Sequence, residues 1–340
     1  MTGPWYQDSL TDQRQIISSR VRLARNFKKY RFHQKLTAPD ATQMVKEAQN
    51  SLTRVNARLF HQMDIQALGQ TEQKVFLEKH IVSPEFLKGS LPRSLLISDD
   101  QNISVMLNEE DHIRIQSVAA GDQLAEALAK ANQIDDLIEE SVEFAFHPEY
   151  GYLTTCPTNT GTGLRASYMI HLPCLERSDL LKKLLPTISK FGITLRGIYG
   201  EGTAPMGSIY QISNQTTLGK SEEDIIQGLQ NVTNTVIEQE NQAMEIMIIN
   251  NRGETENNIY RAYGMLAYSR MITAKEAMDM LSLIRLGYMG GLLDKPKPEK
   301  QIYQIMMEIQ PGHLMRIAGH EMSDAERDTA RANYLREIFH

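Results

Sequence analysis

The amino-acid sequence predicts an α+β fold that is followed by an all-helical C-terminal part. Between about residues 15 and 249, short apolar, β-branched and aromatic runs alternate with longer amphipathic segments, which are the patterns of strands and helices. From Asn250 onward the chain is rich in methionine and helical in pattern, and strand-like runs are largely missing. Methionine commonly fills gaps in helical cores. We therefore expect two domains, one over residues 15–249 and an all-helical one over residues 250–340.

Composition restricts the class of protein. The 340 residues carry a formal net charge of -6, so the chain as a whole lacks the basic field that nucleic acid requires. The 2 cysteines are too few for a disulfide framework or a zinc cluster, which indicates a reducing compartment. The N-terminus has no apolar run, and no stretch approaches the ~18 apolar residues of a membrane span. We expect a cytoplasmic protein without a signal peptide, a nucleic-acid partner or a membrane partner.

The first predicted element is a strand over residues 16–25, whose sequence is IISSRVRLAR. Side chains alternate along a strand, so Arg20 and Arg22 project from the same face. Their guanidinium groups match phosphate oxygens and can form a paired clamp for phosphates. The alternative is a solvated basic edge, which is the more common role of a charge run.

Helices and strands then alternate. The spacing of apolar residues predicts helices over 39–60, 72–80 and 123–144, and strands over 93–98 and 103–107 joined by the turn-forming residues 99–102. The second of these strands leads into three consecutive acids, Glu109, Glu110 and Asp111, beside a histidine. Such a run is either an ordinary surface turn or an acidic loop that faces a cleft.

The central stretch, residues 151–167, combines a thiol, a glycine-bearing loop and a cation. It begins with a strand-like run over 152–155, turns at Cys156 and Pro157, and reaches Arg165 after two glycines. Proline fixes the backbone and the glycines leave room for a ligand or a tight turn. A free cysteine is usually a small core residue, so this pattern alone leaves both a site and a structural loop open.

Further helices are predicted over 178–191 and from Ser221 towards Ile249, and strands over 193–199 and 208–213. Ser221 with Asp224 resembles a capping box. The tripeptide Gly219–Ser221 has the end of a phosphate-binding loop motif, but the upstream glycine that the motif requires is Asn214. We therefore reject a P-loop.

The chain carries four motifs: SSRVR at 18–22, NEEDHIR at 108–114, CPTNTGTGLRAS at 156–167 and RGIYGE at 196–201. They occur in the order seen in phosphagen (guanidino) kinases, and the chain resembles that family over most of its length. Within this family the chain is most similar to the bacterial protein arginine kinases. It begins near the catalytic motifs, without the separate N-terminal helical domain of creatine and arginine kinases, and it carries the motif RDTARA at 327–332. The sequence departs from the family pattern at Tyr168 and in the Ala204–Pro205 loop.

The resemblance implies a fold and a reaction. The fold is the glutamine-synthetase-like guanidino kinase domain, an antiparallel sheet flanked by helices, before the helical C-terminal domain. The reaction is transfer of the ATP γ-phosphoryl group to the guanidinium of arginine residues in proteins. Two alternatives stay open: a small-molecule kinase that acts on free arginine, and a catalytically weak adaptor that binds phosphoarginine.

The resemblance also implies roles for individual residues. The catalytic residues are Glu110 and Glu201, which hold the acceptor guanidinium and accept its proton, and Cys156 beside it. ATP is bound by residues of all four motifs and by one histidine: Ser18, Ser19, Arg20, Val21, Arg22, His80, Arg114, Arg165, Ala166, Ser167, Tyr168, Met169, Arg196, Gly197, Ile198, Tyr199, Gly200 and Glu201. Arg327, Asp328, Arg331 and Ala332 form an allosteric phosphoarginine site. Mg²⁺ is expected to arrive with ATP, because the sequence shows no dedicated cluster of metal ligands.

The implied partners are proteins with exposed arginines. Relatives further suggest an activator protein, delivery of modified proteins to a Clp-type ATPase and protease, and a homodimer or higher oligomer formed through the helical domain.

Overall fold

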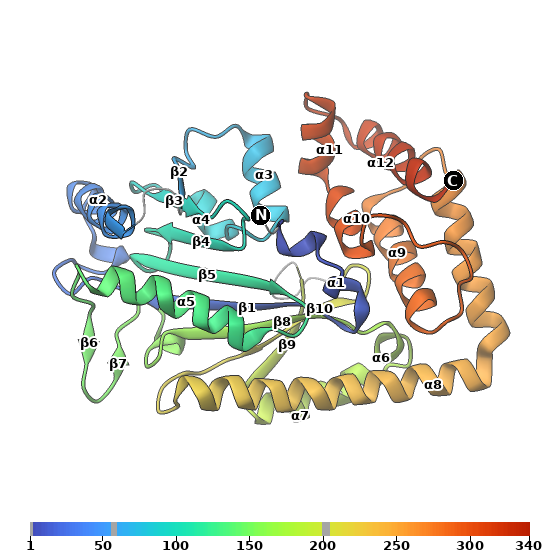
Figure 1. Ribbon diagram of the computed structural model, residues 1–340, viewed down its shortest axis with the longest axis horizontal. Helices are drawn as coiled ribbons and strands as arrows, with labels where there is room; N and C mark the ends of the chain where they lie inside the picture. Colours follow the sequence, from blue (N-terminus) through green and yellow to red (C-terminus); the bar gives the residue numbers. More distant parts are fainter. Residues whose placement is uncertain (1–2, 56–59, 199–204) are drawn as a thin grey trace. The chain divides into compact units, whose positions relative to one another are not determined.

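The computed structural model describes residues 3–55, 60–198 and 205–340. Within them, an eight-stranded sheet has the strand order β2-β3-β4-β5-β1-β8-β10-β9 (Figure 1). The strands are β1 Ile16–Arg25, β2 His61–Met63, β3 Ser94–Ile97, β4 Ile103–Leu107, β5 Ile113–Ala120, β8 Leu164–His171, β9 Ile193–Gly197 and β10 Ile209–Asn214. The pairs β2–β3, β3–β4, β4–β5 and β1–β5 are antiparallel. The predicted α+β class with an antiparallel sheet is confirmed.

The chain forms two compact units, and each is discontinuous in sequence. The first comprises Met1–Trp5, Ser18–Ser167 and Ser213–Leu229, and the second comprises Tyr6–Ile17, Tyr168–Ile212 and Gln230–His340. Strands β1, β8 and β10 contribute residues to both units. This division by contacts differs from the boundary expected near residue 250, and the domain assignment 15–249 and 250–340 stays a prediction.

The register of β1 against β5 places the motif arginines on one face of the sheet. Arg22 lies opposite Gln116, and Ala24 lies opposite Arg114. Directly opposed residues of an antiparallel pair project to the same side. Arg20, Arg22 and Arg114 therefore share a face, as the alternation along the predicted strand required.

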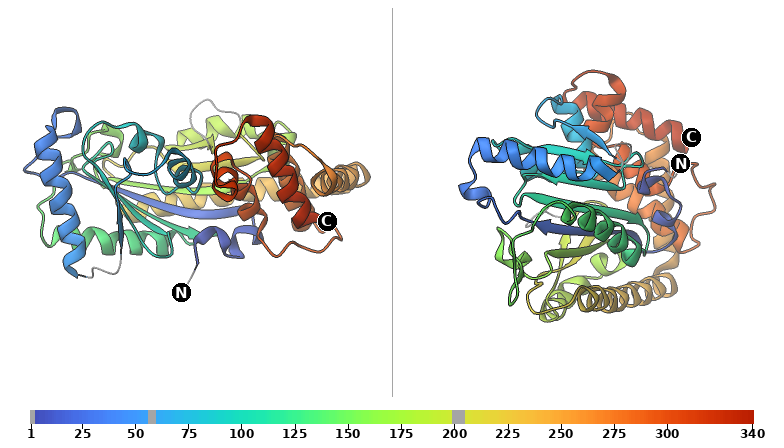
Figure 2. Two further views of the ribbon diagram at one scale, coloured as in Figure 1. Left: turned by 90° about the horizontal axis from the view of Figure 1, so that it is seen from above. Right: turned by 60° about the vertical axis from the view of Figure 1, so that its left-hand side comes forward.

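The other face of these strands is apolar and is covered by helices. Val21 and Leu23 of β1 and Ile115 of β5 are fully buried. Helix α5 (Leu124–Glu139) lies against β5, and α2 (Ala38–Val55) packs on α5 (Figures 1 and 2). Because α5 and α2 cover the apolar face, the face that carries Arg20, Arg22 and Arg114 is the one available for a ligand site.

The segment with α3 (Gln70–Glu78) and α4 (Pro84–Lys88) brings a further residue to the arginine face. An apolar cluster that includes Phe76, Phe86 and Leu95 fixes it against β3 and β4. Gln116, which projects on the arginine face, donates its Nε2–H to the backbone oxygen of His80 at 2.8 Å. His80 is thereby held next to the motif arginines.

The second unit is mostly helical. Its elements besides the shared strands and β9 are α1 Leu10–Gln13, α6 Pro173–Arg177, α7 Leu180–Lys190, most of α8 Glu222–Tyr268, α9 Ala274–Met289, α10 Ile302–Glu308, α11 Pro311–Ala318 and α12 Asp324–Phe339. Helix α8 contains a non-helical residue at Asn251. The remaining short elements of the chain are a hairpin of β6 Phe146–His147 with β7 Gly151–Tyr152 and the 3-10 helices η1 Trp5–Gln7, η2 His33–Lys35 and η3 Pro157–Asn159. In the part of the chain that the structure describes, none of the helices has the length and apolar character to cross a membrane.

Most predicted elements are present, but some differ in extent. The helix expected to run to residue 144 ends at Glu139, and the strand expected over 152–155 is only the two-residue β7. The helix expected to run towards Ile249 continues as α8 to Tyr268. Strand β8 was not predicted, although its Tyr168–Ile170 run is typical of a strand. The glycines just before this run predict a loop, and the strand pattern that follows them was therefore not recognised.

Candidate active site

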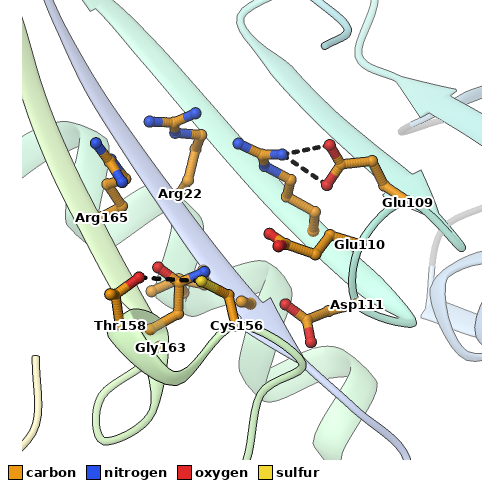
Figure 3. A pocket seen from close by; sticks show the side chains of 12 residues that line it. Arg22, Glu109, Glu110, Asp111, Cys156, Thr158, Gly163 and Arg165 are labelled. Carbon is orange, nitrogen blue, oxygen red and sulfur yellow. Dashed lines mark hydrogen bonds and ion pairs between the residues drawn. The ribbon is translucent and has the colours of Figure 1, made fainter. Parts of the chain in front are cut away.

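A cavity of about 260 Å³ opens on the arginine face in the first unit (Figure 3). Its lining combines the end of β1, the acidic loop before β5, the cysteine loop and the start of β8: Arg22, Leu23, Ala24, Glu109, Glu110, Asp111, Arg114, Cys156, Thr158, Asn159, Gly163 and Arg165. Arg22 and Arg165 lie near one another at one end, and Glu110 and Cys156 face the same space at the other (Figure 3). The predicted residues of three motifs are thus brought together around one space.

The three consecutive acids have three different surroundings, and the first is engaged by an arginine. Glu109 is 7% exposed, and both of its carboxylate oxygens accept from Nη1 of Arg114 at 2.6 Å. The Ser83 hydroxyl donates to the same carboxylate at 2.6 Å. Burial alone would raise the pKa of Glu109, but Arg114 and these hydrogen bonds outweigh it and lower the pKa. The lowered pKa favours the ionised carboxylate of Glu109, and this carboxylate orients Arg114.

The third acid, Asp111, ties two loops together. Its Oδ1 accepts from Nδ2 of Asn26 at 2.6 Å and from the backbone N–H of Thr155 at 2.7 Å. The next residue, His112, accepts from the backbone N–H of Phe27 at Nδ1 and contacts the Arg31 oxygen through Nε2. This pair of contacts fits the neutral ring, and burial lowers the pKa of His112. Asp111 follows Glu110 directly, and Thr155 precedes Cys156. The hydrogen bond between them therefore fixes the cysteine loop relative to the acidic loop.

All three acids line the cavity, but Glu110, the middle one, is exposed whereas its two neighbours are buried. Burial and the adjacent carboxylates of Asp111 and Glu109 raise its pKa, whereas Arg114 and Arg165 oppose the shift. A carboxylate with a raised pKa is a better proton acceptor, so its position and its surroundings suit a general base.

The motif arginines form a cationic cluster. Burial, followed by the charges of Arg20, Arg114 and Arg165, lowers the pKa of Arg22 well below its usual value. The Nε–H of Arg22 is inaccessible to solvent and has no hydrogen-bond partner among the described residues. Arg20 contacts the Ser167 hydroxyl at 3.4 Å, and Arg165 contacts the Ser213 hydroxyl at 3.3 Å. Clustered cations with a buried, unsatisfied donor fit a polyanion such as a nucleotide triphosphate.

His80 stands beside this cluster in an uncommon backbone conformation, with φ 57°. Burial and the charge of Arg20 lower the pKa of His80 to about 3. The ring is therefore neutral near neutral pH and can contact an uncharged base or ribose.

Cys156 occupies the turn before η3. Its Sγ lies 3.1 Å from the Thr158 hydroxyl, and the side chain is half-buried. The second cysteine, Cys174, is 3% exposed, and burial raises the pKa of its thiol. Cys156 is the accessible thiol of the two.

Several predicted nucleotide residues support the sheet instead of lining the cavity. The Ser19 hydroxyl donates to the Gly121 oxygen at 2.7 Å and accepts from Gln123 N–H at 2.8 Å. The others that are buried are Ser18, Val21, Ala166, Ser167, Tyr168 and Met169. In the second unit, Arg196 donates from Nε to the Thr194 hydroxyl at 3.2 Å, and Gly197 and Ile198 are half-buried. Tyr199, Gly200, Glu201 and Ala204 lie outside the described residues.

The motif at 327–332 lies on α12, and its two arginines differ. Arg331 is 1% exposed and donates to the backbone oxygens of Ile309 and Ile272, both at 2.9 Å, and to Asp328 at 2.6 Å. Arg327 is half-buried and pairs with Asp324 and the Met322 oxygen. Arg331 is thus enclosed by backbone carbonyls, whereas Arg327 is partly accessible, and the phosphoarginine site stays a prediction. Ala332 is buried as well.

Sequence reasoning assigned no role to Thr158 and Asn26, which help to build the cavity. Thr158 contacts Cys156, and Asn26 bonds to Asp111. The motif at 156–167 contains Thr158, and Asn26 directly follows the arginine strand, so both positions offered a signal. Gly163, one of the two predicted loop glycines, approaches β1 so closely that an added Cβ would lie 2.6 Å from the Ala24 oxygen.

Among the described residues, no group of three or more His, Cys, Asp or Glu side chains is arranged to hold a metal ion. A donor set of arginines fits phosphates and repels a bare cation. A Mg²⁺ ion that enters with ATP is therefore treated as part of the substrate.

Comparison with known proteins identifies the family. Residues 40–243 match the model of the ATP:guanido phosphotransferase C-terminal catalytic domain, and residues 252–340 match that of the protein-arginine kinase McsB C-terminal domain. The protein-arginine kinase of Bacillus cereus (strain AH187) is 44% identical over 338 residues, 98% of this chain and 95% of that protein. That of Bacillus mycoides (strain KBAB4) is also 44% identical over the same shares.

Solved structures show the same fold at low sequence identity. Lombricine kinase has a TM-score of 0.60 and 21% identity, with 72% of each chain covered. The duplicated taurocyamine kinase from Schistosoma mansoni with bound transition state analog components has a TM-score of 0.62 and 23% identity, and the match covers 75% of this chain and 38% of that one. Together with the matches above, these findings establish that the chain belongs to the ATP:guanido phosphotransferase family and, within it, to the protein-arginine kinases.

Proposed function

We propose that this protein is an ATP-dependent kinase that phosphorylates arginine residues of proteins through the cavity described above. The observation that carries the proposal is the pairing, in one cavity, of the arginine cluster with Glu110, a carboxylate whose pKa is raised. The cluster suits the phosphates of ATP, and Glu110 suits a cationic acceptor that must lose a proton. The family membership supports the same reaction class.

In the proposed reaction, a bond forms between a guanidinium nitrogen of the acceptor and the γ-phosphorus of ATP. The bond between that phosphorus and the bridging oxygen of ADP breaks, and ADP leaves with the electron pair. A protonated guanidinium is a poor nucleophile, so its proton passes to the Glu110 carboxylate during the transfer. Phosphoryl transfer needs mainly positioning and charge stabilisation.

The roles of the other cavity residues follow from their surroundings. Arg22, Arg114 and Arg165 hold the phosphates and stabilise the charge that develops on the transferred group, with Arg20 and His80 beside them. Cys156 lines the same cavity as Glu110, and in the proposed complex its sulfur contacts the acceptor guanidinium. By family resemblance we assign Glu201 as a second carboxylate for the acceptor and Arg196 as a further phosphate contact. Mg²⁺ supplies charge neutralisation on the phosphates when it is bound with ATP.

The test is phosphorylation of an arginine-rich unfolded protein with ATP and Mg²⁺, followed by mass spectrometry under non-acidic conditions that preserve the N–P bond. We expect phosphoarginine on the protein and poor competition by free arginine. Efficient turnover of free arginine without protein labelling would instead support the small-molecule kinase. Phosphoarginine binding without turnover would support the adaptor.

Partners and assembly are proposed from the family alone. They comprise an activator protein, a Clp-type ATPase and protease that receives modified substrates, a homodimer formed through the helical domain, and a phosphoarginine site at α12. Because Arg331 is enclosed, we assign ligand contact in that site to Arg327 and Asp328, with Arg331 and Ala332 supporting them.

A further inference from the structure

Arg25, the last residue of β1, belongs to none of the roles assigned above. It follows Leu23 on the face of the sheet opposite to Arg20 and Arg22, because side chains alternate along the strand. It is 1% exposed and among the largest fully buried side chains. A buried arginine on the helix-covered face cannot bind the nucleotide directly, so its contacts decide what it does.

The guanidinium of Arg25 reaches both ends of the cysteine loop. Its Nη1 donates to the Thr162 oxygen at 2.9 Å, and its Cζ lies 3.6 Å from the centroid of the Tyr152 ring. Between these two contacts runs the loop that carries Cys156. Tyr152 and Gly161 pair across its base, with hydrogen bonds of 2.7 and 3.2 Å. Arg25 therefore sits against the neck of the loop, where its two strands close.

Close packing at Gly163 shows how tightly this neck is fitted. Gly163 has φ +66°, and a Cβ added there would lie 2.5 Å from Nη1 of Arg25. The backbone N–H of Ala24 donates to the Gly163 oxygen at 3.0 Å. A shift of Arg25 is thus transmitted to the end of the cysteine loop.

Asp135 of α5 holds the guanidinium from behind. Its Oδ2 accepts from Nε at 3.0 Å and from Nη2 at 2.6 Å, while its buried Oδ1 has no partner among the described residues. A buried ion pair is expensive to desolvate, and an apolar pair of similar volume is often as stable or more so. Stability alone is therefore a weak reason for this arrangement, whereas fixing a loop in one place requires directional contacts.

We propose that Arg25 is a positioning residue that clamps the neck of the cysteine loop and thereby places Cys156 against the acceptor guanidinium. Lysine cannot replace it, because a single ammonium lacks the planar fork that bonds Asp135 and Thr162 while it stacks on Tyr152. Arg20 and Arg22 lie on the other face of β1, so the clamp acts on the acceptor side more than on ATP binding. The kinetic part of this inference rests on the proposed function, but the placement of the loop does not.

The experiment compares Arg25→Lys and Tyr152→Leu with the wild type in the full chain. Lys130→Ala, which removes another charged side chain of α5, is the matched control. For Arg25→Lys we expect kcat for transfer to protein arginine to fall about 10- to 100-fold, as for a catalytic group displaced by a fraction of an ångström to an ångström. The KM for ATP should change little. Tyr152→Leu should also lower kcat with little change in the KM for ATP, but by a smaller factor. Because this variant keeps the buried Arg25–Asp135 pair, it still tests the proposal if Arg25→Lys fails to fold.

The second readout is the rate at which iodoacetamide alkylates Cys156 without substrates, followed by mass spectrometry. Loosening the neck should raise this rate in Arg25→Lys and Tyr152→Leu but not in Lys130→Ala, while Cys174 stays unlabelled. Alkylation needs no kinase activity, so a failure of the proposed function leaves this arm intact. The proposal is overturned if both variants alkylate at the wild-type rate, or if kcat and the KM for ATP change equally.

Discussion

Arg22 and Arg331 were both predicted to bind phosphate, and the structure gives them opposite surroundings. Arg22 stands among other cations, and its buried Nε–H has no partner in the described part of the chain. Arg331 is buried too, but backbone oxygens of Ile309 and Ile272 and the Asp328 carboxylate satisfy it. Burial by itself therefore does not identify a ligand site. An arginine that still needs an anion does.

The comparison extends to the acids. Glu109 and Asp111 are buried and committed to protein partners, whereas Glu110 faces the cavity. Substitution of a side chain that is bonded to protein partners should change stability or local geometry. Substitution of a side chain that is available in the cavity should change ligand binding or catalysis. The following predictions test that distinction, beginning with the largest effect.

Glu110→Gln should lower kcat by about 10²- to 10⁴-fold, the usual contribution of a general base. The amide keeps the shape of the side chain but cannot accept the acceptor's proton. Binding of ATP, measured by calorimetry, should persist, because the phosphates meet the arginine cluster instead. The matched control is Glu126→Gln, which removes an acid from the surface of α5. Turnover of Glu110→Gln close to wild type would withdraw the assignment.

Arg331→Met should destabilise the fold by roughly 3 kcal/mol, because two backbone oxygens and Asp328 lose their buried partner. The midpoint of denaturant unfolding measures this, with the exposed Arg261→Ala as the control. A stability unchanged within error, together with lost phosphoarginine binding, would mean that Arg331 is a ligand residue after all.

Arg22→Ala should weaken ATP binding by about 10- to 100-fold, since a hydrogen bond to a charged group contributes about 1.5–3 kcal/mol. Its thermal stability should stay the same or rise, because repulsion within the cationic cluster is relieved. Arg31→Ala, an exposed arginine outside the cavity, should leave ATP affinity unchanged. Lost stability with retained ATP affinity would place Arg22 in the structural class of Arg331.

Proton acceptance by Glu110 sets the acidic limb of the pH–activity profile. Its pKa is raised, so the active carboxylate is lost as the pH falls through a value above that of an ordinary glutamate. Asp111→Asn keeps an oxygen for Thr155 N–H but removes the neighbouring charge, and the limb of kcat/KM should move to lower pH. Glu126→Gln should not move it. If the acidic limb of the kcat/KM profile lies at the same pH in Asp111→Asn as in the wild type, a group other than Glu110 determines it.

Arg327→Ala should have the smallest effect on the fold, below about 1 kcal/mol, because it removes a surface ion pair with Asp324. Basal kinase activity should stay near wild type, while any activation by added phosphoarginine should disappear. Arg261→Ala again serves as the control. A wild-type response to phosphoarginine would reduce the motif on α12 to a structural cluster.

The features that depend on local periodicity and on motifs could be predicted from the amino-acid sequence. Alternation placed Arg20 and Arg22 on one face of β1, and turn-forming residues marked the loop with Cys156. The loss of strand patterns after Asn250 indicated the helical part, and the motifs identified the family before any geometry was known.

Which of several similar side chains is available to a ligand could not be predicted, because contacts between distant segments set it. Glu109, Glu110 and Asp111 are adjacent in sequence, yet Arg114, the cavity and Thr155 give them separate roles. Likewise, Arg25 shares β1 with Arg22 but meets Asp135, 110 residues away in sequence. The physical reason is that burial, charge pairing and pKa depend on neighbours from distant segments, and periodicity within one segment carries no information about those neighbours.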